Sequence, residues 1–526
     1  MAERAETNVR QIVHRAARWY PANEAVVDGI QRLTYAELQD QVRRMAALLH
    51  SLGVRKGDRV ALLMHPSAAH VIALFGAIEL GAIPCALHLR ESAALLQAVV
   101  ERLSPRVLVY DAALDELASE LQRRVPLITG AVRAASAISP PEKLEAGSDP
   151  LIPRDLANWE MDFEPMPIAE DETAAIVLSS GTTGVPKGIM HSHRALVESA
   201  RGGAQLWRIN ARSSIINLST TAFIGWYNCA LPFLNASAKL VFQNQWDPQQ
   251  YLETCQRERT TVAFLVPTMW RMVMKLPVED YDLGAIRLAG YAGEPIDAGT
   301  LRAIQERVCP DVLNMYGTTE TGSCAGGTVL YAEDITNERR LASVGKPFLN
   351  ADVRVVRPGG SPEEEVAPGE EGEVLIRGPS VAREVWEQPE VARRIFDGPW
   401  WRSGDLGGLD EEGFLYLHGR VDDMIVSGGI NILPNEIEES VMSHPLVVEA
   451  AAIGIPDAER GQRVLAVVVT SGEVSPEELD AHVLGTGLSR YKRPREFEFM
   501  SELPRGNTGK LNRRLLREQI LRQRAG

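Results

Sequence analysis

The sequence predicts an α/β protein with a large N-terminal domain of mostly parallel, helix-covered sheets and a β-rich part, followed by a small mobile α+β C-terminal domain. Three observations predict it: helix and strand patterns alternate in the first third, a β-rich stretch covers residues 352–377, and the segment after residue 420 has strands and helices of its own. The 526 residues suffice for one large and one smaller domain. We expect these domains at 1–421 and 422–526.

The N-terminal third has a βαβα rhythm. Thr34 and Glu37 have the spacing of a capping box, which predicts a helix start. Apolar residues then recur at helical intervals, at Leu38, Val42, Met45, Leu49 and Leu52, and Gly53 ends the pattern. Short apolar runs at Val60–Met64 and Val107–Tyr110 predict buried strands, with a helix from about Ala68 to Leu80 between them. This order implies a largely parallel sheet.

The rest of the chain continues with short predicted strands. Residues 135–170 are rich in Pro, Asp and Glu and are expected to form a surface connection. The strands expected after it are Ala174–Leu178, Thr261–Val266, Ile286–Leu288, Asp311–Leu313, Val353–Val356, Glu373–Arg377, Ala450–Ile453 and Val464–Val469.

Composition excludes several classes of protein. The formal charge of -15 disfavours binding to nucleic acid or to an anionic membrane. Five dispersed cysteines without CxxC spacing favour reduced thiols in the cytoplasm over disulfides or a zinc site. No secretory signal and no membrane span is visible in the sequence. We therefore expect a soluble cytoplasmic protein.

The clearest chemical signal is Leu178–Gly188, which reads LSSGTTGVPKG and follows a predicted buried strand. Glycines let backbone N–H groups turn toward phosphate oxygens, and hydroxyls with a lysine neutralise the remaining charge. It is not a Walker A loop, because Pro186 stands where the second glycine is needed and Gly188 follows Lys187. We interpret the segment as a phosphate-binding loop, with a plain Gly/Ser/Thr turn as the alternative.

Five more segments follow this loop. They are Tyr291–Pro295 (YAGEP), Asn314–Glu320 (NMYGTTE), Trp401–Asp405 (WRSGD), Gly419–Ile432 (GRVDDMIVSGGINI) and Leu503–Lys510 (LPRGNTGK). Together with Ser179–Gly188 they resemble the motifs of the adenylate-forming superfamily, which includes acyl-CoA synthetases, aryl-acid CoA ligases, adenylation domains and luciferases. The likeness covers nearly the whole chain, and six motifs in one order are specific. It is closest to the acid–CoA ligases.

The resemblance implies a site for ATP and Mg²⁺. It places there Ser179, Ser180, Gly181, Thr182, Thr183 and Gly184 of the loop, then Gly293, Glu294, Pro295, Asn314, Met315, Tyr316, Gly317 and Thr318, and finally Asp405 and Arg420. Tyr316 would line the adenine slot, Asp405 would accept the ribose hydroxyls, and Arg420 would add positive charge nearby. Glu320 and Thr183 would hold Mg²⁺, which favours one or two protein oxygens besides substrate phosphates.

Two half-reactions in one site are also implied. In the first, a carboxylate displaces pyrophosphate from ATP, and Lys510 stabilises the charge that gathers between the carboxylate and the α-phosphate. Lys187 would hold the departing pyrophosphate. In the second, a thiolate attacks the acyl adenylate. In the family, the small domain rotates between the two half-reactions, about a hinge at the residue that matches Asp422.

The thiol acceptor would be coenzyme A or the phosphopantetheine of a carrier protein. The tunnel for the pantetheine arm would be bordered by Ser427, Gly428, Gly429 and Ile430. Tyr491 is expected to stack on the CoA adenine, with Arg493 or Arg495 at the phosphates. The alternative, a basic segment that is only exposed to solvent, is nearly as well supported. The family often has a tryptophan before the Gly-Gln pair, but Arg460 stands there, which leaves the acceptor open.

The acyl pocket is expected around Thr221–Tyr227, where Phe223 replaces a histidine that many relatives carry. The expected lining is apolar and aromatic: Phe223, Trp226, Tyr227, Val266, Gly290 and Met315. Some of these rings can instead belong to the core. No acidic residue stands near Phe223 to receive an amine, which disfavours an α-amino acid. An apolar aromatic, alicyclic or medium-sized acid is expected.

The leading hypothesis is an ATP-dependent carboxylic acid–CoA ligase that acts through an acyl adenylate. An acyl-AMP ligase that loads a carrier protein is the alternative within the same chemistry. A non-catalytic adenylate-binding regulatory protein is the alternative from another class, and intact Lys510, Glu320, Asp405 and Lys187 argue against it. A luciferase-type oxygenase is left open by the motifs. The expected partners are a small carboxylic acid, ATP and a thiol; a homodimer is left open.

Overall fold

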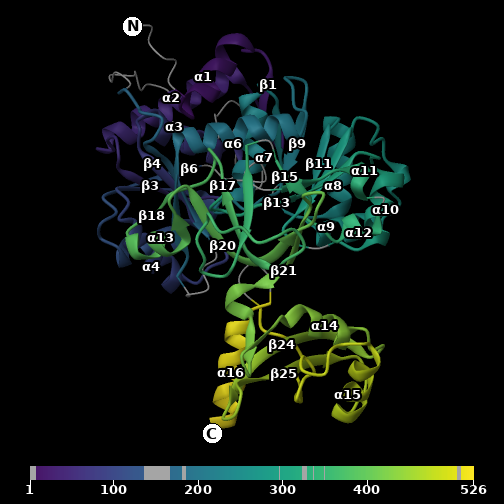
Figure 1. Cartoon of the computed structure of the whole chain (residues 1–526). Helices are drawn as coiled ribbons and strands as arrows, with labels where there is room; N and C mark the ends of the chain where they lie inside the picture. The colour runs from purple at the N-terminus through teal and green to yellow at the C-terminus, as the bar shows by residue number, and fades with distance from the viewer. Residues whose placement is uncertain are drawn as a thin grey trace. The chain divides into compact units, whose positions relative to one another are not determined.

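The structure, a computed structural model, describes residues 7–134, 166–179, 185–243, 245–294, 296–322, 328–335, 337–348, 350–505 and 511–525 (Figure 1). The chain forms two compact units. The first comprises Met1–Val353, Ile376–Arg402 and Gly413–Leu415, and the second comprises Arg354–Leu375, Ser403–Glu412 and Tyr416–Gly526. The domain boundary expected between residues 421 and 422 stays a prediction.

The largest sheet of the described chain has nine strands in the order β15-β14-β13-β12-β11-β9-β10-β1-β2. Their bounds are β1 Glu24–Asp28, β2 Gln31–Thr34, β9 Ser214–Asn217, β10 Lys239–Phe242, β11 Val262–Phe264, β12 Leu288–Ala292, β13 Val312–Tyr316, β14 Thr328–Leu330 and β15 Lys346–Pro347. Neighbours from β13 to β1 run parallel, and the pairs at both ends are antiparallel. The expected fold class of mostly parallel sheets is confirmed.

Three smaller sheets complete the α/β and β-rich parts. A parallel sheet has the order β4-β3-β5-β6, an antiparallel one has the order β18-β8-β7, and a five-stranded one has the order β16-β17-β20-β19 with β21 on β20. Their bounds are β3 Arg59–Leu63, β4 Ile83–Ala86, β5 Val107–Asp111, β6 Gly130–Ala134, β7 Thr173–Ser179, β8 Lys187–Ser192, β16 Asp352–Val356, β17 Gly372–Arg377, β18 Glu384–Val385, β19 Phe396–Asp397, β20 Trp400–Leu409 and β21 Leu415–Arg420.

The helices of the first unit pack against strands of the nine-stranded sheet, the β4-β3-β5-β6 sheet and the β18-β8-β7 sheet (Figure 1). Their bounds are α1 Arg10–Trp19, α2 Tyr35–Ser51, α3 Ala68–Glu79, α4 Ala93–Leu103, α5 Asp115–Arg124, α6 His193–Leu206, α7 Ile224–Asn235, α8 Pro248–Glu258, α9 Pro267–Met274, α10 Ala298–Arg307, α11 Ala332–Ile335, α12 Glu338–Leu341 and α13 Pro389–Ile395, with short 3-10 turns at Ala112–Leu114 (η1) and Val278–Asp280 (η4). The capping box predicted for α2 is confirmed: the Thr34 side chain accepts from Glu37 N, and the Glu37 carboxylate accepts from Thr34 N.

Strand β3 shows why its sheet is helix-covered on both faces. Val60 and Leu62 belong to the main apolar core, whereas Ala61 and Leu63 belong to a second core cluster. Successive strand side chains point to opposite faces, so an unbroken apolar run needs a partner layer on each side. The run predicted at Val60–Met64 therefore marks a strand buried on both faces.

The ends of three strands differ by one to four residues from the places near which they were expected. The strand expected at Ile286–Leu288 lies at Leu288–Ala292, and the one expected at Asp311–Leu313 lies at Val312–Tyr316. Strand β12 extends through Gly290, and β13 extends through Asn314. The strand expected at Thr261–Val266 is confined to Val262–Phe264. The predicted surface connection lies outside the described residues except for 166–170.

The second unit contains a five-stranded sheet in the order β23-β22-β25-β24, with β26 on β25. The bounds are η6 Val421–Asp423, β22 Ile425–Ser427, β23 Ile430–Ile432, α14 Pro434–Met442, β24 Val447–Asp457, β25 Gly461–Thr470, α15 Pro476–Gly485, β26 Glu496–Phe499 and α16 Arg513–Ala525. Along β24, Ala450 and Ala452 face the core shared with α14 and α15, whereas Ala451 and Ile453 face the core shared with α16. The α+β prediction for this segment is confirmed (Figure 1).

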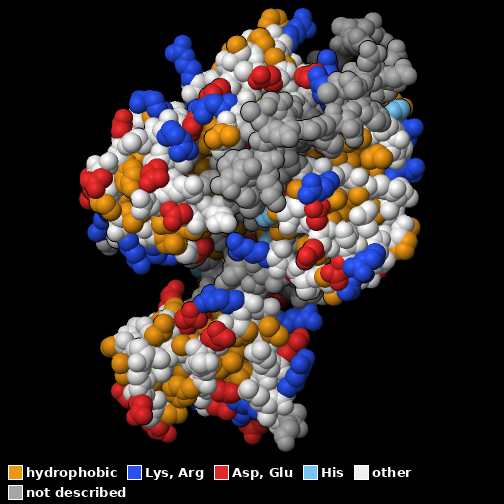
Figure 2. Space-filling view, turned by 180° about the vertical axis from the view of Figure 1, so that it is seen from behind, with side chains coloured by type: hydrophobic (Ala, Val, Ile, Leu, Met, Phe, Trp, Pro, Cys, Tyr) orange, Lys and Arg blue, Asp and Glu red, His pale blue; other side chains and the backbone are white. Residues whose placement is uncertain are grey.

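The described surface carries both signs of charge. Figure 2 shows acidic and basic side chains interspersed on the face in view, without a continuous basic surface. Within the described residues, no helix is long and apolar enough to cross a membrane.

Candidate active site

The phosphate-loop segment connects two antiparallel strands. Ser179 ends β7 and Lys187 begins β8, and the two are register partners across the hairpin. The expected site residues Ser180, Gly181, Thr182, Thr183 and Gly184 lie outside the described residues. A Walker A loop instead joins a strand to a helix. The hairpin therefore agrees with the departure from the Walker pattern seen in the sequence.

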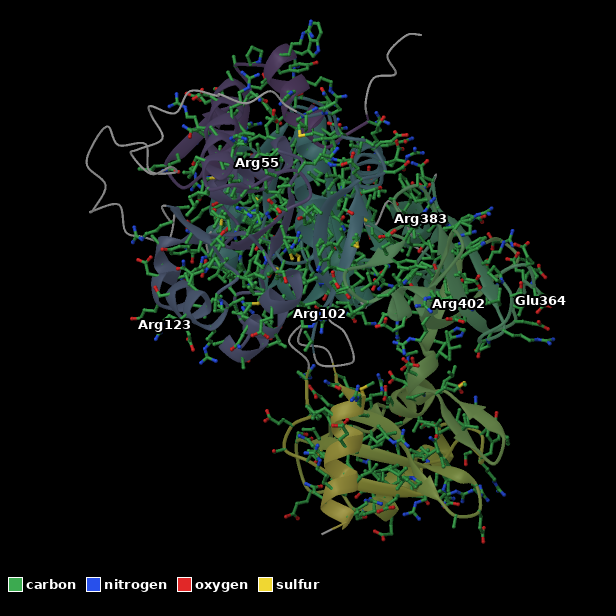
Figure 3. All side chains as sticks on the ribbon, turned by 90° about the vertical axis from the view of Figure 1, so that its left-hand side faces the viewer. Arg55, Arg102, Arg123, Glu364, Arg383 and Arg402 are labelled. Atoms are coloured by element: carbon green, nitrogen blue, oxygen red, sulfur yellow. The ribbon has the colours of Figure 1, made fainter. Side chains whose placement is uncertain are left out.

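Three contacts fix the Lys187 end of this hairpin. Arg102 on α4, labelled in Figure 3, donates from Nη1 to the Pro186 carbonyl oxygen at 3.2 Å. Trp386 donates its backbone N–H to the Gly188 carbonyl oxygen at 2.8 Å. A Cβ added to Gly188 would lie 2.8 Å from Ile176 Cγ2, so the glycine allows close packing of β7 on β8. These contacts hold Lys187 at a defined place.

The segment that carries Glu320 is held from three sides. Ala382 N donates to the Glu320 carbonyl oxygen at 2.8 Å, Ser380 Oγ donates to the Thr321 carbonyl oxygen at 2.9 Å, and Ser199 Oγ donates to the Gly322 carbonyl oxygen at 2.7 Å. The Glu320 backbone is thereby fixed, which limits where its carboxylate can reach. No cluster of three or more His, Cys, Asp or Glu side chains that could hold a metal occurs among the described residues.

The predicted adenine-slot residues converge at one edge of the nine-stranded sheet. Strands β12 and β13 run parallel with Tyr291 opposite Asn314 and Ala292 opposite Met315, so both strands end at the same edge. Gly293 and Glu294 follow β12, and Tyr316 ends β13 just before Gly317 and Thr318. Crevices outside the carboxyl ends of parallel strands are the usual ligand sites of such sheets. Pro295 lies outside the described residues.

Local contacts order this edge. Gly293 has φ +91°, a left-handed conformation that favours glycine. The Glu294 carboxylate accepts a hydrogen bond from Thr268 Oγ1 at 3.1 Å, and Thr318 N donates to Thr321 Oγ1 at 2.9 Å. These two hydrogen bonds and the left-handed conformation of Gly293 therefore order the backbone at this edge.

The residues predicted for the acyl pocket come from strands β12 and β13 and from the N-terminal ends of α7 and α9. Gly290 and Met315 lie on neighbouring strands, Phe223 is the N-cap of α7, and Val266 is the N-cap of α9. Trp226 and Tyr227 are almost fully buried in the main core, where the Trp226 ring packs edge-on against His70 with centroids 4.6 Å apart. Burial raises the pKa of the Tyr227 hydroxyl. The Phe223 ring packs against His88, at 4.9 Å between centroids.

Sequence reasoning missed Trp207, which closes the space beside Gly290. A Cβ added to Gly290 would lie 2.7 Å from Trp207 Cζ3, and Leu313 Cδ1 would be 3.5 Å away. The Trp207 indole is fully buried and packs edge-on against Phe264, with centroids 5.5 Å apart. Because Trp207 follows α6 and Gly290 lies on β12, only the tertiary structure brings them together.

In the second unit, Asp405 and Arg420, which the resemblance places separately near the ribose, form an ion pair. Arg420 Nη1 lies 2.6 Å from Asp405 Oδ1 and also donates to the Ser403 carbonyl oxygen at 2.9 Å. Asp405 N donates to Ser403 Oγ at 2.8 Å, which orients the turn. Gly404 between them has φ +66°, and a Cβ there would lie 3.0 Å from Arg420 Nη2. The glycine thus permits the pair.

The segment around the expected hinge is a single 3-10 turn, η6, in which Asp422 is the middle residue. Its neighbour Asp423 lies 3.4 Å from Arg513 Nη1, and burial raises the pKa of the Asp423 carboxyl against the opposing effect of Arg513. Arg513 is also paired with Glu438 at 2.6 Å. The turn is therefore tied to α14 and α16 through the side chain after Asp422.

The residues expected to bind the thiol acceptor lie together in the second unit. Ser427, Tyr491, Arg493 and Arg495 border a cavity of about 200 Å³. The cavity is completed by Asp457, Glu459, Arg460, Arg463 and Val464. Gly428 and Gly429 have φ of +59° and +81°, and nothing lies within 4 Å of a Cβ added to either, while Ile430 is exposed. The two glycines therefore leave open space beside the backbone of Ser427–Ile430.

Arg460 and Arg463 were missed as cavity residues. Arg460 lies at the β24–β25 hairpin, where its carbonyl oxygen accepts from Gly428 N at 2.8 Å. Two of the four arginines that line the cavity form ion pairs with carboxylates. Arg463 pairs with Glu496 at 3.1 Å, and Arg493 pairs with Asp480 at 2.7 Å. The pairing of Ser427 with Gly461 creates this cluster, and a single sequence carries no signal for it.

Lys510 lies outside the described residues, but the ends of its turn are described. Arg505 and Leu511 form an isolated antiparallel bridge, and Leu511 packs against the core shared by β24, β25 and α16. The two residues that flank the segment with Lys510 therefore lie side by side in the second unit.

Comparison with known proteins identifies the family. The model of the AMP-binding enzyme family matches residues 13–386, and the model of the AMP-binding enzyme C-terminal domain matches residues 436–510. The chain belongs to the AMP-binding enzyme family. The resemblance to adenylate-forming enzymes is confirmed, and with it the expectation of an AMP-forming acid–thiol ligase.

Three curated relatives show the range of this likeness. The chain is 31% identical over 517 residues to the long-chain-fatty-acid–CoA ligase FadD13 of Mycobacterium tuberculosis (strain ATCC 25618 / H37Rv), covering 97% of this chain and 98% of that protein. It is 31% identical over 510 residues to feruloyl-CoA synthase of Amycolatopsis sp, covering 94% and 96%. It is 31% identical over 516 residues to 3-hydroxybenzoate–CoA ligase of Aromatoleum sp. (strain CIB), covering 94% and 93%.

Solved structures agree over almost the whole chain. ATP-bound MatB from Rhodopseudomonas palustris has a TM-score of 0.83 and 26% identity, covering 97% of this chain and 99% of that one. The o-succinylbenzoate CoA synthetase MenE of Bacillus subtilis, in complex with ATP and magnesium ion, has a TM-score of 0.80 and 26% identity, covering 96% and 98%. The expected fold class is thereby confirmed a second time.

Proposed function

We propose that this protein is an ATP-dependent carboxylic acid–CoA ligase that forms an acyl adenylate and accepts an apolar aromatic, alicyclic or medium-sized acid. The convergence of Ser427, Tyr491, Arg493 and Arg495 with Arg460 around one cavity carries the choice of free CoA. Several cationic side chains beside an exposed aromatic ring suit a nucleotide with phosphate groups. Arg463 and Arg493 are paired with Glu496 and Asp480, so Arg460 and Arg495 are the arginines that would meet the phosphates of CoA, which a bare phosphopantetheine arm lacks.

In the first half-reaction a carboxylate oxygen bonds to the α-phosphorus of ATP, and the bond to the β-phosphate oxygen breaks. Lys510 would lie between the two anions, and Lys187 would face the departing pyrophosphate. Asp405 would accept the ribose hydroxyls, with Arg420 orienting its carboxylate. Tyr316 and the backbone after Gly293 would border the adenine.

The site also fits Mg²⁺ in its donor chemistry. Glu320 offers a carboxylate on a backbone held by Ala382, and Thr183 offers a hydroxyl. Magnesium prefers such hard oxygens and takes its remaining ligands from water and substrate phosphates. When bound, the ion would neutralise phosphate charge.

In the second half-reaction the thiolate sulfur bonds to the acyl carbonyl carbon, and the bond to AMP oxygen breaks. The arm would pass Ser427–Ile430, where Gly428 and Gly429 present no side chain. Arg495 and Arg460 would meet the phosphates, and Tyr491, 44% exposed, would stack on the base. We also propose that residues 422–526 turn about Asp422 between the two half-reactions and that Lys510 leaves as the thiol enters.

A panel of acids tests this function. AMP release is measured with benzoate, phenylacetate, cyclohexanecarboxylate, hexanoate, decanoate and palmitate, each with and without CoA. We expect release that depends on both an apolar acid and CoA, with no ADP formed. Release that requires a phosphopantetheinylated carrier protein and ignores CoA would favour the carrier-loading alternative, and failure of every acid to support pyrophosphate exchange would favour the regulatory protein.

Trp207 supports an acid of limited length, because its buried ring occupies the space beside Gly290. Trp207→Leu should raise kcat/KM for decanoate relative to hexanoate. Each further buried methylene contributes about 0.8 kcal/mol, so the ratio should change on the order of tenfold for two added carbons in contact. The matched control is Trp270→Leu. The Trp270 ring is equally buried and donates to the Gly290 carbonyl oxygen at 3.1 Å. It lies outside the core cluster that contains Trp207 and Met315. An unchanged ratio in Trp207→Leu would contradict this assignment.

Asp422→Pro tests the turning of the C-terminal segment. Proline is tolerated in the first turn of a helix, so η6 can form, but the fixed φ opposes rearrangement. We expect acid-dependent pyrophosphate exchange within about threefold of wild type and thioester formation lowered by about tenfold or more. Asp422→Ala, which leaves φ free, should retain both activities. Equal losses in both half-reactions of Asp422→Pro would argue against a hinge here.

A further inference from the structure

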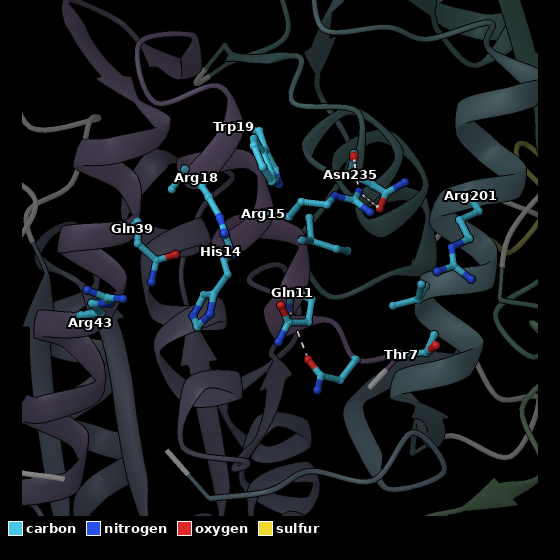
Figure 4. Close-up of a pocket in the computed structure, with 14 residues that line it drawn as sticks. Thr7, Gln11, His14, Arg15, Arg18, Trp19, Gln39, Arg43, Arg201 and Asn235 are labelled. Atoms are coloured by element: carbon cyan, nitrogen blue, oxygen red, sulfur yellow. Dashed lines mark hydrogen bonds between the residues drawn. The ribbon is translucent and has the colours of Figure 1, made fainter. Parts of the chain in front are cut away.

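A second cavity, of about 730 Å³, lies in the first unit where α1, α2, α6 and the end of α7 meet (Figure 4). Its volume is in the usual range for sites that bind small molecules. None of its fourteen lining residues belongs to the predicted ATP, acyl or CoA sites. The cavity therefore has no place in the proposed reaction.

The lining is basic. It contains His14, Arg15, Arg18, Arg43 and Arg201, and no Asp or Glu occurs among the fourteen described residues that line it. Two of these groups meet carboxylates from outside the lining: His14 Nε2 lies 2.8 Å from Glu79 Oε2, and Arg201 Nη1 lies 2.7 Å from Glu198 Oε1. The other three arginines, Arg15, Arg18 and Arg43, have no carboxylate partner among the described residues.

These three arginines differ in what they touch. Arg15 donates to the backbone and side-chain oxygens of Asn235, at 2.7 and 2.9 Å. Arg18 lies over the Trp19 ring, 5.0 Å from its centroid. The Arg43 side chain has no hydrogen bond or ion pair within the described parts of the chain. Three uncompensated cations around one cavity favour a ligand with more than one negative charge.

A buried amide points to a ligand independently of this charge. Gln39 on α2 is only 7% exposed, and neither its Nε2 nor its Oε1 has a hydrogen-bond partner. Buried polar groups are nearly always hydrogen-bonded, and an unpaired one is costly. Figure 4 shows Gln39 extending from α2 toward His14 on α1. A ligand that both donates and accepts hydrogen bonds would satisfy this amide.

The cavity also offers an aromatic surface. Trp19 ends α1 and is 65% exposed, with Arg18 beside its ring. An exposed indole next to guanidinium groups can stack on a planar base. A phosphorylated nucleotide combines the three properties that this cavity selects: negative charge, a base edge that donates and accepts, and a flat ring.

We propose that this cavity is a second, non-catalytic site for a soluble nucleotide. Arg43, Arg15 and Arg18 bind its phosphates, the Gln39 amide bonds to the edge of its base, and Trp19 stacks on the ring. This site is separate in its residues from the one that binds ATP for adenylation.

Calorimetric titration of the full chain with GDP tests the proposal. We expect one bound GDP in wild type and affinities lowered about tenfold or more in Arg43→Gln and in Gln39→Leu. Arg44→Gln is the matched control, because Arg44 neighbours Arg43 on α2 but pairs with Asp40 at 2.7 Å. The control and the catalytic-site variant Asp405→Ala should bind GDP as wild type does, and melting curves confirm that each variant is folded.

Three results would overturn the proposal. One is GDP binding that survives in Arg43→Gln and Gln39→Leu but is lost in Asp405→Ala, which would place the nucleotide in the catalytic site. The second is equal weakening in Arg43→Gln and Arg44→Gln, which would indicate a general effect of charge. The third is Arg43-dependent flotation with phosphatidylglycerol vesicles and no binding of GDP, which would make the cavity a site for lipid headgroups.

Discussion

Lys510→Ala should lower acid-dependent exchange of labelled pyrophosphate into ATP by about 10²–10³-fold, because removing one group aimed at developing charge costs this much. The carboxylate and the triphosphate are both anions, and no other lysine occurs in the Leu503–Lys510 motif. Thioester formation from a chemically prepared acyl adenylate should change by less than about threefold, since that half-reaction joins no two anions at phosphorus.

The control for this variant is Arg505→Gln. Arg505 lies at the start of the same turn and is paired with Glu449, so its loss removes a positive charge and one surface ion pair. It should leave both half-reactions near the wild-type rates. If Lys510→Ala slows thioester formation as much as pyrophosphate exchange, the lysine supports the fold or the binding of both substrates and not the adenylation step.

Asp405→Ala should raise the KM for ATP by about 10²-fold, because hydrogen bonds to a charged group are each worth about 1.5–3 kcal/mol. The variant also leaves Arg420 without the carboxylate that lies 2.6 Å from its Nη1. The KM for the carboxylic acid should change little, since the proposed role of Asp405 is confined to the ribose.

Asp410→Ala is the control for the nucleotide effect. Asp410 follows β20, the strand that contains Asp405, and accepts a hydrogen bond from Tyr416 Oη at 3.3 Å. A rise in the KM for ATP of equal size in both variants would indicate a general disturbance of β20. An unchanged KM for ATP in Asp405→Ala would remove the ribose assignment.

The sequence predicts best those parts of the site that depend on local order. The capping box of α2 needs only Thr34 and Glu37, and both hydrogen bonds are present. The convergence of Gly293 with Tyr316 follows from the parallel βαβ order, because parallel strands end at a common edge. Motif order added the assignment of Asp405 and Arg420, which are fifteen positions apart and form an ion pair.

Long-range packing could not be predicted in the same way. The strand expected at Ile286–Leu288 stopped short of Gly290, which lies inside β12. A glycine is needed there because Trp207 packs against it. Arg460 was recognised only as a departure from the family pattern. It lies at the cavity bordered by Ser427 and Tyr491 because β22 pairs with β25, and no periodicity encodes that pairing.

The central claim, that a carboxylate oxygen attacks the α-phosphorus of ATP, is tested by following that oxygen. The acid that performs best in the panel is prepared with ¹⁸O in its carboxylate and turned over with ATP and CoA, and the products are analysed by mass spectrometry. We predict one ¹⁸O atom in each AMP and none in pyrophosphate. Label found in inorganic phosphate together with ADP, or AMP free of label, would contradict an acyl-adenylate mechanism.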